Sequence, residues 1–325
     1  MNLTEIVLAI LAGLVLFLFA IGNLSEILQD TLGKNARQWI LRFTSGTWSA
    51  IATGTVLTML LDSSSAVIII TIILVNAGTL QFRQTMGIVL GANIGTTLSS
   101  QIIAMDIGKY SPVLLVLGFI LLILSRSEQV TATGKILLNF GVLFFGLFTM
   151  ENAVEPLRNA PFISEWLQQT SHPVYGAMVG AITTLIIQSS SATVGMTIIL
   201  AKKGMIDLAG GLAIMIGAEL GTVSDTLLAT IKGSREAVKT ALFHLLFSLT
   251  TLVLGLLLFD PFVRSIRWIS SHAPIERAIA NGHVLFNVFG VLLFVWFIPH
   301  LERMLNALVP NKTGNSPSSP TIPMN

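Results

Sequence analysis

The chain has 325 residues, of which 53% are hydrophobic and only 10% are charged. An ordinary soluble domain carries roughly 25% charged residues, so a soluble globule of this composition could not cover its own surface. The net charge of +2 is too small to indicate nucleic-acid binding, and the lack of cysteine excludes disulfides and thiolate metal sites. Apolar runs of about 20 residues, the length that crosses a bilayer core, recur along the chain. We therefore predict an all-α polytopic membrane protein.

The first predicted span covers residues 3–27. It carries Glu5 where a secretory signal would carry basic residues, and no small-residue cleavage site follows its apolar run, so we expect a retained span. Residues 47–78 form a second apolar stretch, which three consecutive serines, Ser63 to Ser65, interrupt. Each half is too short to cross a bilayer alone. The stretch is therefore either one broken span or a re-entrant helical hairpin.

The remaining predicted elements repeat this order. A glycine-rich helix and a short span follow, and then a second long helix, a second serine-interrupted stretch and a second glycine-rich helix. A later segment, which holds Pro261, Arg264, Arg267 and Pro274, is expected to lie at the membrane interface. The last fifteen residues are rich in Pro, Ser and Asn and are predicted to be a disordered tail. The predicted ranges are 82–106, 111–125, 136–154, 173–204 (interrupted), 208–231, 238–259, 260–277 (interfacial), 282–298 and 311–325 (tail).

Sliding the chain along itself by 126 residues aligns the two units without a gap from the first helix of each to its glycine-rich segment. Asp62-Ser63-Ser64-Ser65 falls on Gln188-Ser189-Ser190-Ser191, and Gly91-Ala92-Asn93-Ile94-Gly95-Thr96 falls on Gly217-Ala218-Glu219-Leu220-Gly221-Thr222. Chance apolar similarity would match Leu with Ile, but it would not align two serine triplets and two GxxxG pairs in one register. We predict two transmembrane repeats, residues 1–134 and 135–310, with an extra C-terminal span in the second.

The orientation of the repeats depends on the number of crossings. If the serine stretches re-enter without crossing, three spans precede the second unit, and the result is an inverted repeat with seven crossings. If they cross, the repeat is parallel. In the inverted arrangement with the N-terminus outside, eleven of the 18 Lys and Arg residues lie inside, which favours that orientation. We predict inverted-topology repeats in the plasma membrane, with a cytoplasmic C-terminus.

The serine triplets are candidate anion ligands. Broken helices are tolerated at membrane depth only where they are buried in protein or line a watery cavity. Serines at the start of an apolar helix present hydroxyls and unpaired N–H groups at the positive end of the helix dipole, which favours anions. Two such ends that face each other across an inverted repeat form the usual substrate site of a secondary transporter. The serines concerned are Ser63, Ser64, Ser65, Ser189, Ser190 and Ser191.

The glycine-rich segments and the lone carboxylates are candidates for cation coupling. Side-chain oxygens and carbonyls freed by glycine are suitable Na⁺ ligands, and ionisable groups in apolar segments are costly enough to suggest function. Alone, a serine cluster or a GxxxG pair is more often a cap or a packing face, but the doubling in one register favours a site. The residues assigned to sodium or proton coupling are Asp62, Asn93, Thr96, Thr97, Glu219, Thr222 and Asp225.

Other chemistry has little support in the sequence. His244 and His283 are expected to be polar packing residues, because no second ligand stands at metal-binding spacing from either. A P-loop and a GxSxG motif are both missing, so ATP hydrolysis and serine-nucleophile catalysis are not indicated. We predict that the protein is not an enzyme and needs no cofactor or metal beyond Na⁺ as a coupling ion.

At these motifs the sequence resembles the type II sodium–phosphate cotransporter family, which carries a QSSS motif and a G-[AES]-N-I-G-T-T segment in each repeat. The second repeat reads Gln188-Ser189-Ser190-Ser191, and the first reads Gly91-Ala92-Asn93-Ile94-Gly95-Thr96-Thr97. The segment from Ala280 to Asn287 is similar to the family's A-x-x-H-x-L-F-N segment, and the segment at His244 is a weaker copy. The resemblance covers about residues 10–305, and the chain stops short of the PhoU-like domain of many bacterial members.

The resemblance implies Na⁺-driven symport of inorganic phosphate by alternating access, with Gln188 joining both serine triplets around the anion. Three departures are Asp62 in place of the first Gln, Glu219 in place of the second Asn, and Asp225 where the first repeat has Ser99. They leave open the same fold with another oxyanion or an organic anion, or with H⁺ coupling. A non-transporting membrane scaffold or sensor is the alternative from another class. The expected partners are phosphate or a related anion, sodium ions and the bilayer, with no nucleic acid; a homodimer stays open.

Overall fold

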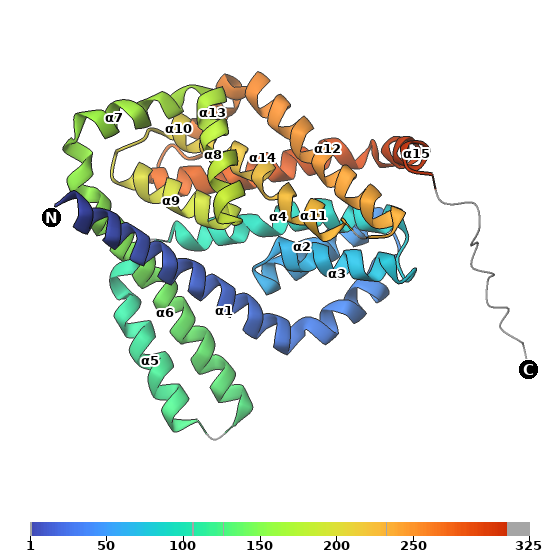
Figure 1. The fold of residues 1–325 in the computed structure, drawn as a ribbon, viewed down its shortest axis with the longest axis horizontal. Helices are drawn as coiled ribbons and strands as arrows, with labels where there is room; N and C mark the ends of the chain where they lie inside the picture. The colour runs from blue at the N-terminus through green and yellow to red at the C-terminus, as the bar shows by residue number, and fades with distance from the viewer. Residues whose placement is uncertain (1, 106, 126, 232, 311–325) are drawn as a thin grey trace, which may run out of the picture.

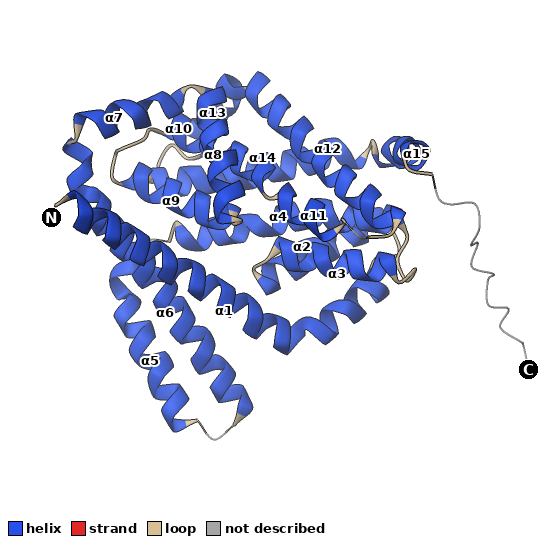
Figure 2. Ribbon diagram, in the orientation of Figure 1, coloured by secondary structure: helices blue, strands red, loops and turns tan. Residues whose placement is uncertain are grey.

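The computed structural model of the chain describes residues 2–105, 107–125, 127–231 and 233–310, and every regular element among them is helical (Figure 2). The all-α prediction is confirmed for these residues. The tail predicted at 311–325 lies outside them.

The first unit contains five α-helices, and a short 3-10 turn, η1 (Gly108–Tyr110), leads into the last of them. The bounds are α1 Leu3–Phe43, α2 Thr47–Leu61, α3 Ser64–Asn76, α4 Phe82–Ile103 and α5 Ser111–Leu124. The predicted first helix therefore ends too early, because its polar continuation stays helical to Phe43. Its hydropathy marks the part suited to a membrane and not the end of the helix.

The second unit repeats this order and adds further helices. Its opening helix, α6, begins at Glu128, so the predicted boundary between residues 134 and 135 falls inside a helix. A helical end piece, η2 (Glu155–Asn159), α7 and η3 (Gln169–Ser171), separates its opening helix from its serine stretch. The predicted helix over 208–231 is in fact two helices that meet at Thr222. The bounds are α6 Glu128–Val154, α7 Pro161–Gln168, α8 Pro173–Ile187, α9 Ser190–Lys202, α10 Leu208–Gly221, α11 Val223–Ala229, α12 Arg235–Leu257, α13 Phe259–Ile269, α14 Ile275–Val295 and α15 Ile298–Leu308.

Six helical segments in the described residues are long and apolar enough to cross a membrane. The seventh predicted crossing, at residues 111–125, falls on a shorter apolar helix, Gly108–Leu124, and stays a prediction. The candidate spans are Leu3–Asp30, Phe82–Ile103, Glu128–Arg158, Leu208–Ala229, Arg235–Leu257 and Ile275–Val295.

Glycines bring the short helices against the glycine-rich ones at backbone contact. A Cβ added at Gly91 would lie 2.0 Å from the carbonyl oxygen of Ile51 on α2, and one at Gly217 would lie 1.9 Å from that of Ala177 on α8. No side chain larger than hydrogen fits at either crossing. The GxxxG pairs are therefore packing faces in both units, and they fix α2 on α4 and α8 on α10 in the same way.

The two units meet across α14. Figure 1 shows α5 and α6 projecting from the body as a pair, while α14 runs between α4 and the helices of the second unit. One hydrophobic cluster joins α1, α6, α9 and α10 and includes Ile279 of α14; the other joins α2, α3, α4 and α12 and includes Val291 of α14. The extra C-terminal span is thus part of the interior of both units.

Candidate functional site

Each serine stretch is broken at the same residue by the same backbone geometry. Asp62 and Gln188 have φ angles of 47° and 57°, the left-handed conformation, and they are the only non-glycine residues with positive φ among those described. The next residue begins a new helix: the Ser63 hydroxyl accepts from the N–H of Ala66 at 3.1 Å, and that of Ser189 accepts from Ala192 at 3.2 Å. A left-handed residue followed by a serine N-cap stops one helix and starts the next.

A left-handed glutamine is uncommon, because a Cβ is crowded in that conformation. Such strain persists where the surrounding structure holds it, and it is concentrated at functional sites. Helices α2 and α3, of 15 and 13 residues, are about 22 and 20 Å long, so neither spans a bilayer alone. Figure 1 draws both turns toward the middle of the molecule. We call the turn at 62–65 the first tip and the turn at 188–191 the second tip.

The first tip is surrounded by carboxylates. The Ser99 hydroxyl on α4 donates to Asp62 Oδ1, and the Ser65 hydroxyl donates to Asp225 Oδ2 on α11 at 2.7 Å. The second of these bonds joins residues 160 positions apart and links the two units. Asp62, Ser65, Ser99 and Asp225, all predicted or noted from the sequence, are therefore brought together in one cluster.

The second tip has a different environment. The side chain of Gln188 is exposed, whereas Ser190 is 5% exposed. Ser189 serves as the cap, and Thr193, one turn into α9, accepts from the hydroxyl of Thr184 on α8 at 2.8 Å. This tip presents amide and hydroxyl groups, where the first tip presents two bonded carboxylates.

Among the predicted oxygen ligands of the glycine-rich helices, Asn93, Thr96 and Thr97 are buried and Thr222 is half-buried, and all four already donate hydrogen bonds within their own helices. The Thr96, Thr97 and Thr222 hydroxyls donate to the carbonyls of Asn93, Ile94 and Glu219 in their own helices, at 2.7–2.8 Å. The Asn93 amide nitrogen donates to Val89 O at 2.8 Å. Each hydroxyl oxygen keeps acceptor capacity, which is what a cation requires.

Two histidines occupy matched places that the sequence argument assigned only to packing. His283 on α14 bonds through Nδ1 to the Ser100 hydroxyl of α4, and its Nε2 lies 2.7 Å from Glu219 Oε1 of α10. His244 on α12 bonds through Nδ1 to the Thr226 hydroxyl of α11 at 2.8 Å. Ser100 and Thr226 are 126 positions apart, which is the repeat offset. In the sequence, the two A-x-x-H-x-L-F segments mark both histidines, but they do not indicate which residues bond to them.

The contacts of His244 and His283 show which helices occupy equivalent positions beside the two units. Helix α12 packs on α11 through His244, and α14 packs on α4 through His283. By sequence order, α5 corresponds to α12, yet α5 packs on α6 at the projecting edge. Helix α14 therefore takes the place beside the first unit that α12 takes beside the second.

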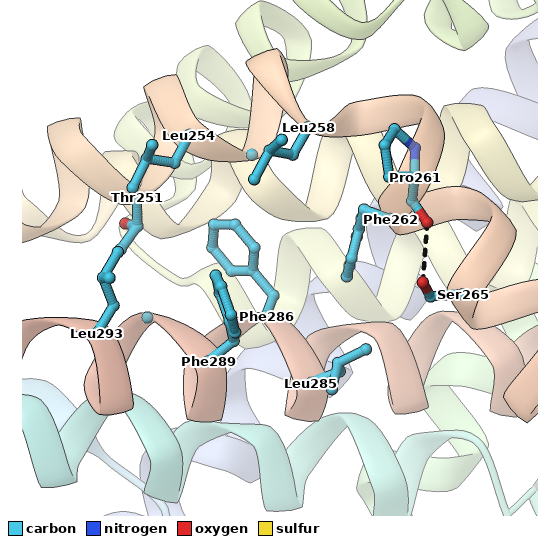
Figure 3. A pocket seen from close by; sticks show the side chains of 12 residues that line it. Thr251, Leu254, Leu258, Pro261, Phe262, Ser265, Leu285, Phe286, Phe289 and Leu293 are labelled. Carbon is cyan, nitrogen blue, oxygen red and sulfur yellow. Dashed lines mark hydrogen bonds between the residues drawn. The ribbon is translucent and has the colours of Figure 1, made fainter.

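An apolar cavity of about 220 Å³ lies elsewhere, between α12, α13 and α14 (Figure 3). Leu254, Leu258, Phe286 and Phe289 are among the side chains that line it, and the Ser265 hydroxyl is turned back to the carbonyl of Pro261 at 2.9 Å. None of the predicted site residues lines this cavity. It is therefore separate from the tips.

Residues 16–152 and 158–269 match the sequence profile of the Na+/Pi-cotransporter family. The chain belongs to that family. It is a family of membrane transporters, so the chain is a multi-pass membrane transporter of the phosphate and sodium class and not an enzyme. The matched residues include both tips, both glycine-rich helices and all of α12.

The curated relatives differ in how far they extend. The chain is 28% identical over 310 residues to the uncharacterized protein YqeW of Bacillus subtilis, covering 94% of this chain and 99% of the relative. It is 26% identical over 263 residues to the putative inorganic phosphate export protein YjbB of Escherichia coli and to its Salmonella typhimurium counterpart, covering 80% of this chain and 48% of each relative. The chain thus spans about half the length of the YjbB proteins. No solved structure matches it.

Proposed function

We propose that the protein carries out sodium-coupled symport of inorganic phosphate by alternating access. The observation that carries this proposal is the pair of tips, each a left-handed residue followed by a serine-capped helix, in a member of the Na+/Pi-cotransporter family. Paired broken helices are where secondary transporters hold substrate and coupling ions.

Phosphate is bound between the tips, and the second tip supplies most of the donors. Gln188, Ser190 and Ser191 offer amide and hydroxyl donors at the positive end of α9, as a charged anion requires. Ser64 adds a hydroxyl from the first tip. Ser63 and Ser189 hold the helix starts through their caps and keep hydroxyl protons for the anion.

The coupling cation is bound beside the first tip. Two carboxylates, Asp62 and Asp225, are collected there by Ser99 and Ser65. A bare carboxylate about 6 Å from one phosphate charge would repel it by roughly 3 kcal/mol at an effective dielectric near 20. A cation between the carboxylates and the anion removes this repulsion and makes anion binding depend on sodium. Asn93, Thr96, Thr97, Thr222 and Glu219 supply further oxygens from the glycine-rich helices.

The two units, 1–134 and 135–310, form inverted-topology repeats in the plasma membrane, with the C-terminus in the cytoplasm. The chain has no cysteine, so single cysteines can be introduced without a background. Cysteines placed near Gly78 and Gly204, the glycines after α3 and α9, should be labelled from opposite sides of the membrane. Labelling of both from one side would refute the inverted arrangement.

The direct test is phosphate flux in proteoliposomes. An inward Na⁺ gradient should drive labelled phosphate inward above the rate with an equal K⁺ gradient, and a reversed gradient should drive it out. Equal rates in Na⁺ and K⁺ would refute sodium coupling, and an inward H⁺ gradient then tests the alternative coupling. Competition by sulfate or by a dicarboxylate tests whether another anion is the substrate.

Export is the second candidate for the physiological direction. The YjbB relatives are named as putative inorganic phosphate exporters. Phosphate release from preloaded cells, with and without external Na⁺, distinguishes export from uptake. If the protein is instead a non-transporting scaffold, replacement of all six tip serines by alanine should leave the cellular phenotype intact.

A further inference from the structure

The contact between the units includes a buried chain of three polar side chains, each from a different helix. Ser100 of α4 is 2% exposed, His283 of α14 is 1% exposed and Glu219 of α10 is 5% exposed. The imidazole bonds to the other two through separate nitrogens. Polar groups at this depth are retained where they are fully bonded, and here each one is a partner of the next.

The two hydrogen bonds fix the orientation of the His283 ring. Nε2 is bonded to Glu219 Oε1 and Nδ1 to the Ser100 hydroxyl, so both polar atoms of the imidazole are held. Loss of the Ser100 hydroxyl leaves the ring held at one nitrogen only, and its orientation toward Glu219 is then less strictly fixed.

The matched position in the other half has no such chain. Among the described residues, His244 bonds to Thr226, and no carboxylate takes the place that Glu219 has beside His283. The residue 126 positions before Glu219 is Asn93, whose amide donates to its own helix. The chain from hydroxyl to imidazole to carboxylate is therefore a specific feature of the α4, α14 and α10 contact and not a general packing device.

We propose that His283 is a positioning residue that holds the Glu219 carboxylate in place for a coupling cation only while α4 and α10 keep the relative position seen here. This inference rests on the proposed sodium-coupled transport. Alternating access moves one unit relative to the other, and such a movement separates Ser100 from Glu219, which are joined through the His283 ring. A cation is then bound tightly in one state and released in the other, as a shift between two states requires.

The test measures cation binding directly on the purified chain. The melting temperature in detergent is followed against NaCl at constant ionic strength, with KCl as the balancing salt. Ser100→Ala should raise the half-saturating Na⁺ concentration roughly ten-fold, the lower range for a lost hydrogen bond that supports a charged group. Ser100→Thr keeps a hydroxyl and introduces the residue type found at position 226, so it should show the wild-type half-saturating Na⁺ concentration. Thr226→Val is the matched control and should leave it unchanged.

A double variant separates positioning from simple packing. Ser100→Ala combined with Glu219→Gln should weaken Na⁺ binding no more than Glu219→Gln alone, because both substitutions act on one interaction. Additive effects, or an unchanged Na⁺ dependence in Ser100→Ala with a lowered melting temperature, would overturn the proposal. Ser100→Cys, similar in size and a weak donor, replaces the alanine variant if that variant does not fold.

The result of this Na⁺-binding test can be distinguished from the result of the phosphate flux test of the proposed function. If Na⁺ stabilises the wild type in this way but does not drive phosphate flux, the symport proposal fails and the assignment of His283 holds. A wild type whose melting temperature does not respond to Na⁺ would refute the assignment of His283, whatever the flux shows.

Discussion

The two tips share a backbone and differ in charge. Both pass through one left-handed residue, with φ of 47° at Asp62 and 57° at Gln188, and both begin the next helix with a serine cap. Around the first tip, Ser99 and Ser65 are bonded to Asp62 and Asp225. No carboxylate is bonded to the second tip among the described residues.

The comparison separates what the repeat keeps from what it changes. Backbone geometry is kept because each tip must stop a helix and start another at membrane depth, where unpaired peptide groups are costly. In the proposed site, side-chain charge is free to change because it is used to bind ions and not to pack helices. One duplicated backbone can therefore hold a cation at one tip and an anion at the other, and the following predictions test that division.

The largest expected effect concerns the shared backbone. Gly91→Ala and Gly217→Ala should each destabilise the protein by about 3 kcal/mol, because the new Cβ would lie 2.0 Å from Ile51 O or 1.9 Å from Ala177 O. Both values refer to backbone atoms, which cannot move aside as a side chain can. The melting temperature in detergent is the measurement.

The control for both is Gly22→Ala on α1, where an added Cβ has no neighbour within 4 Å. This variant should keep or raise the melting temperature, since alanine favours helix by roughly 1 kcal/mol over glycine. A wild-type melting temperature for Gly217→Ala with a large loss for Gly91→Ala would mean that the two units are not packed alike.

The second prediction exchanges charge between the tips. Gln188→Asp should lower phosphate affinity about a hundred-fold, from a repulsion of roughly 3 kcal/mol at about 6 Å, and Gln188→Asn is its neutral control. Asp62→Asn should instead leave phosphate affinity at saturating Na⁺ near normal and change the steepness of the Na⁺ dependence. Equal effects of the two charge changes on phosphate affinity would contradict the division of roles. Initial rates of flux in proteoliposomes are the measurement.

Much of this backbone could be predicted from the sequence, because its signals are local. The serine triplets and the 126-residue register specify where each stretch breaks. The doubled GxxxG pairs were interpreted as part of a site, but Gly91 and Gly217 lie at backbone packing contacts. The end of α1 at Phe43 was missed because hydropathy falls well before helix formation ends. The break at Thr222 was missed because the glycine before it, Gly221, has a counterpart in the first unit, Gly95, where helix α4 continues unbroken.

The contacts of the site could be predicted only in part. Asp62 and Asp225 were suspected as lone carboxylates, but their partners could not be named, since Ser65 lies 160 positions from Asp225. Ser100 lies 183 positions from His283, and the bond exists because α14 and not α5 packs on α4. Tertiary packing of this kind leaves no periodic pattern along the chain.

The third prediction sharpens the comparison within the serines. Ser190→Ala and Ser64→Ala should each weaken phosphate binding roughly ten- to a hundred-fold, the range for a lost hydrogen bond to a charged ligand of about 1.5–3 kcal/mol. Ser65→Ala should act on the Na⁺ dependence, because its hydroxyl donates to Asp225. Phosphate saturation curves at fixed high Na⁺, and Na⁺ curves at fixed phosphate, distinguish the two. Normal phosphate binding in both Ser190→Ala and Ser64→Ala would refute the anion site.

The smallest expected effect concerns the far ends of the hairpins, where the two units again differ in charge. At the end of α9, Lys203 pairs with Glu151 and Glu155 of the second unit, each at 3.2 Å. At the end of α3, the neutral Asn76 side chain accepts from the N–H of Ser234 at 2.7 Å. The second hairpin is therefore held partly by ions and the first by an uncharged hydrogen bond.

Salt should distinguish these two anchors. Lys203→Gln should change the free energy of unfolding by less than about 1 kcal/mol, because Glu155 is 63% exposed and Glu151 keeps its pair with Lys202 at 2.7 Å. Raising NaCl or KCl from 0.05 to roughly 1 M shortens the screening length to about 3 Å and should speed amide exchange at the end of α9 more than at the end of α3. The difference should shrink in Lys203→Gln, which leaves the pair of Lys202 with Glu151, and disappear when Lys202→Gln is added. Equal acceleration at both ends in the wild type would show that the ion pairs do not hold the second hairpin, and the two units would then differ in charge only at their tips.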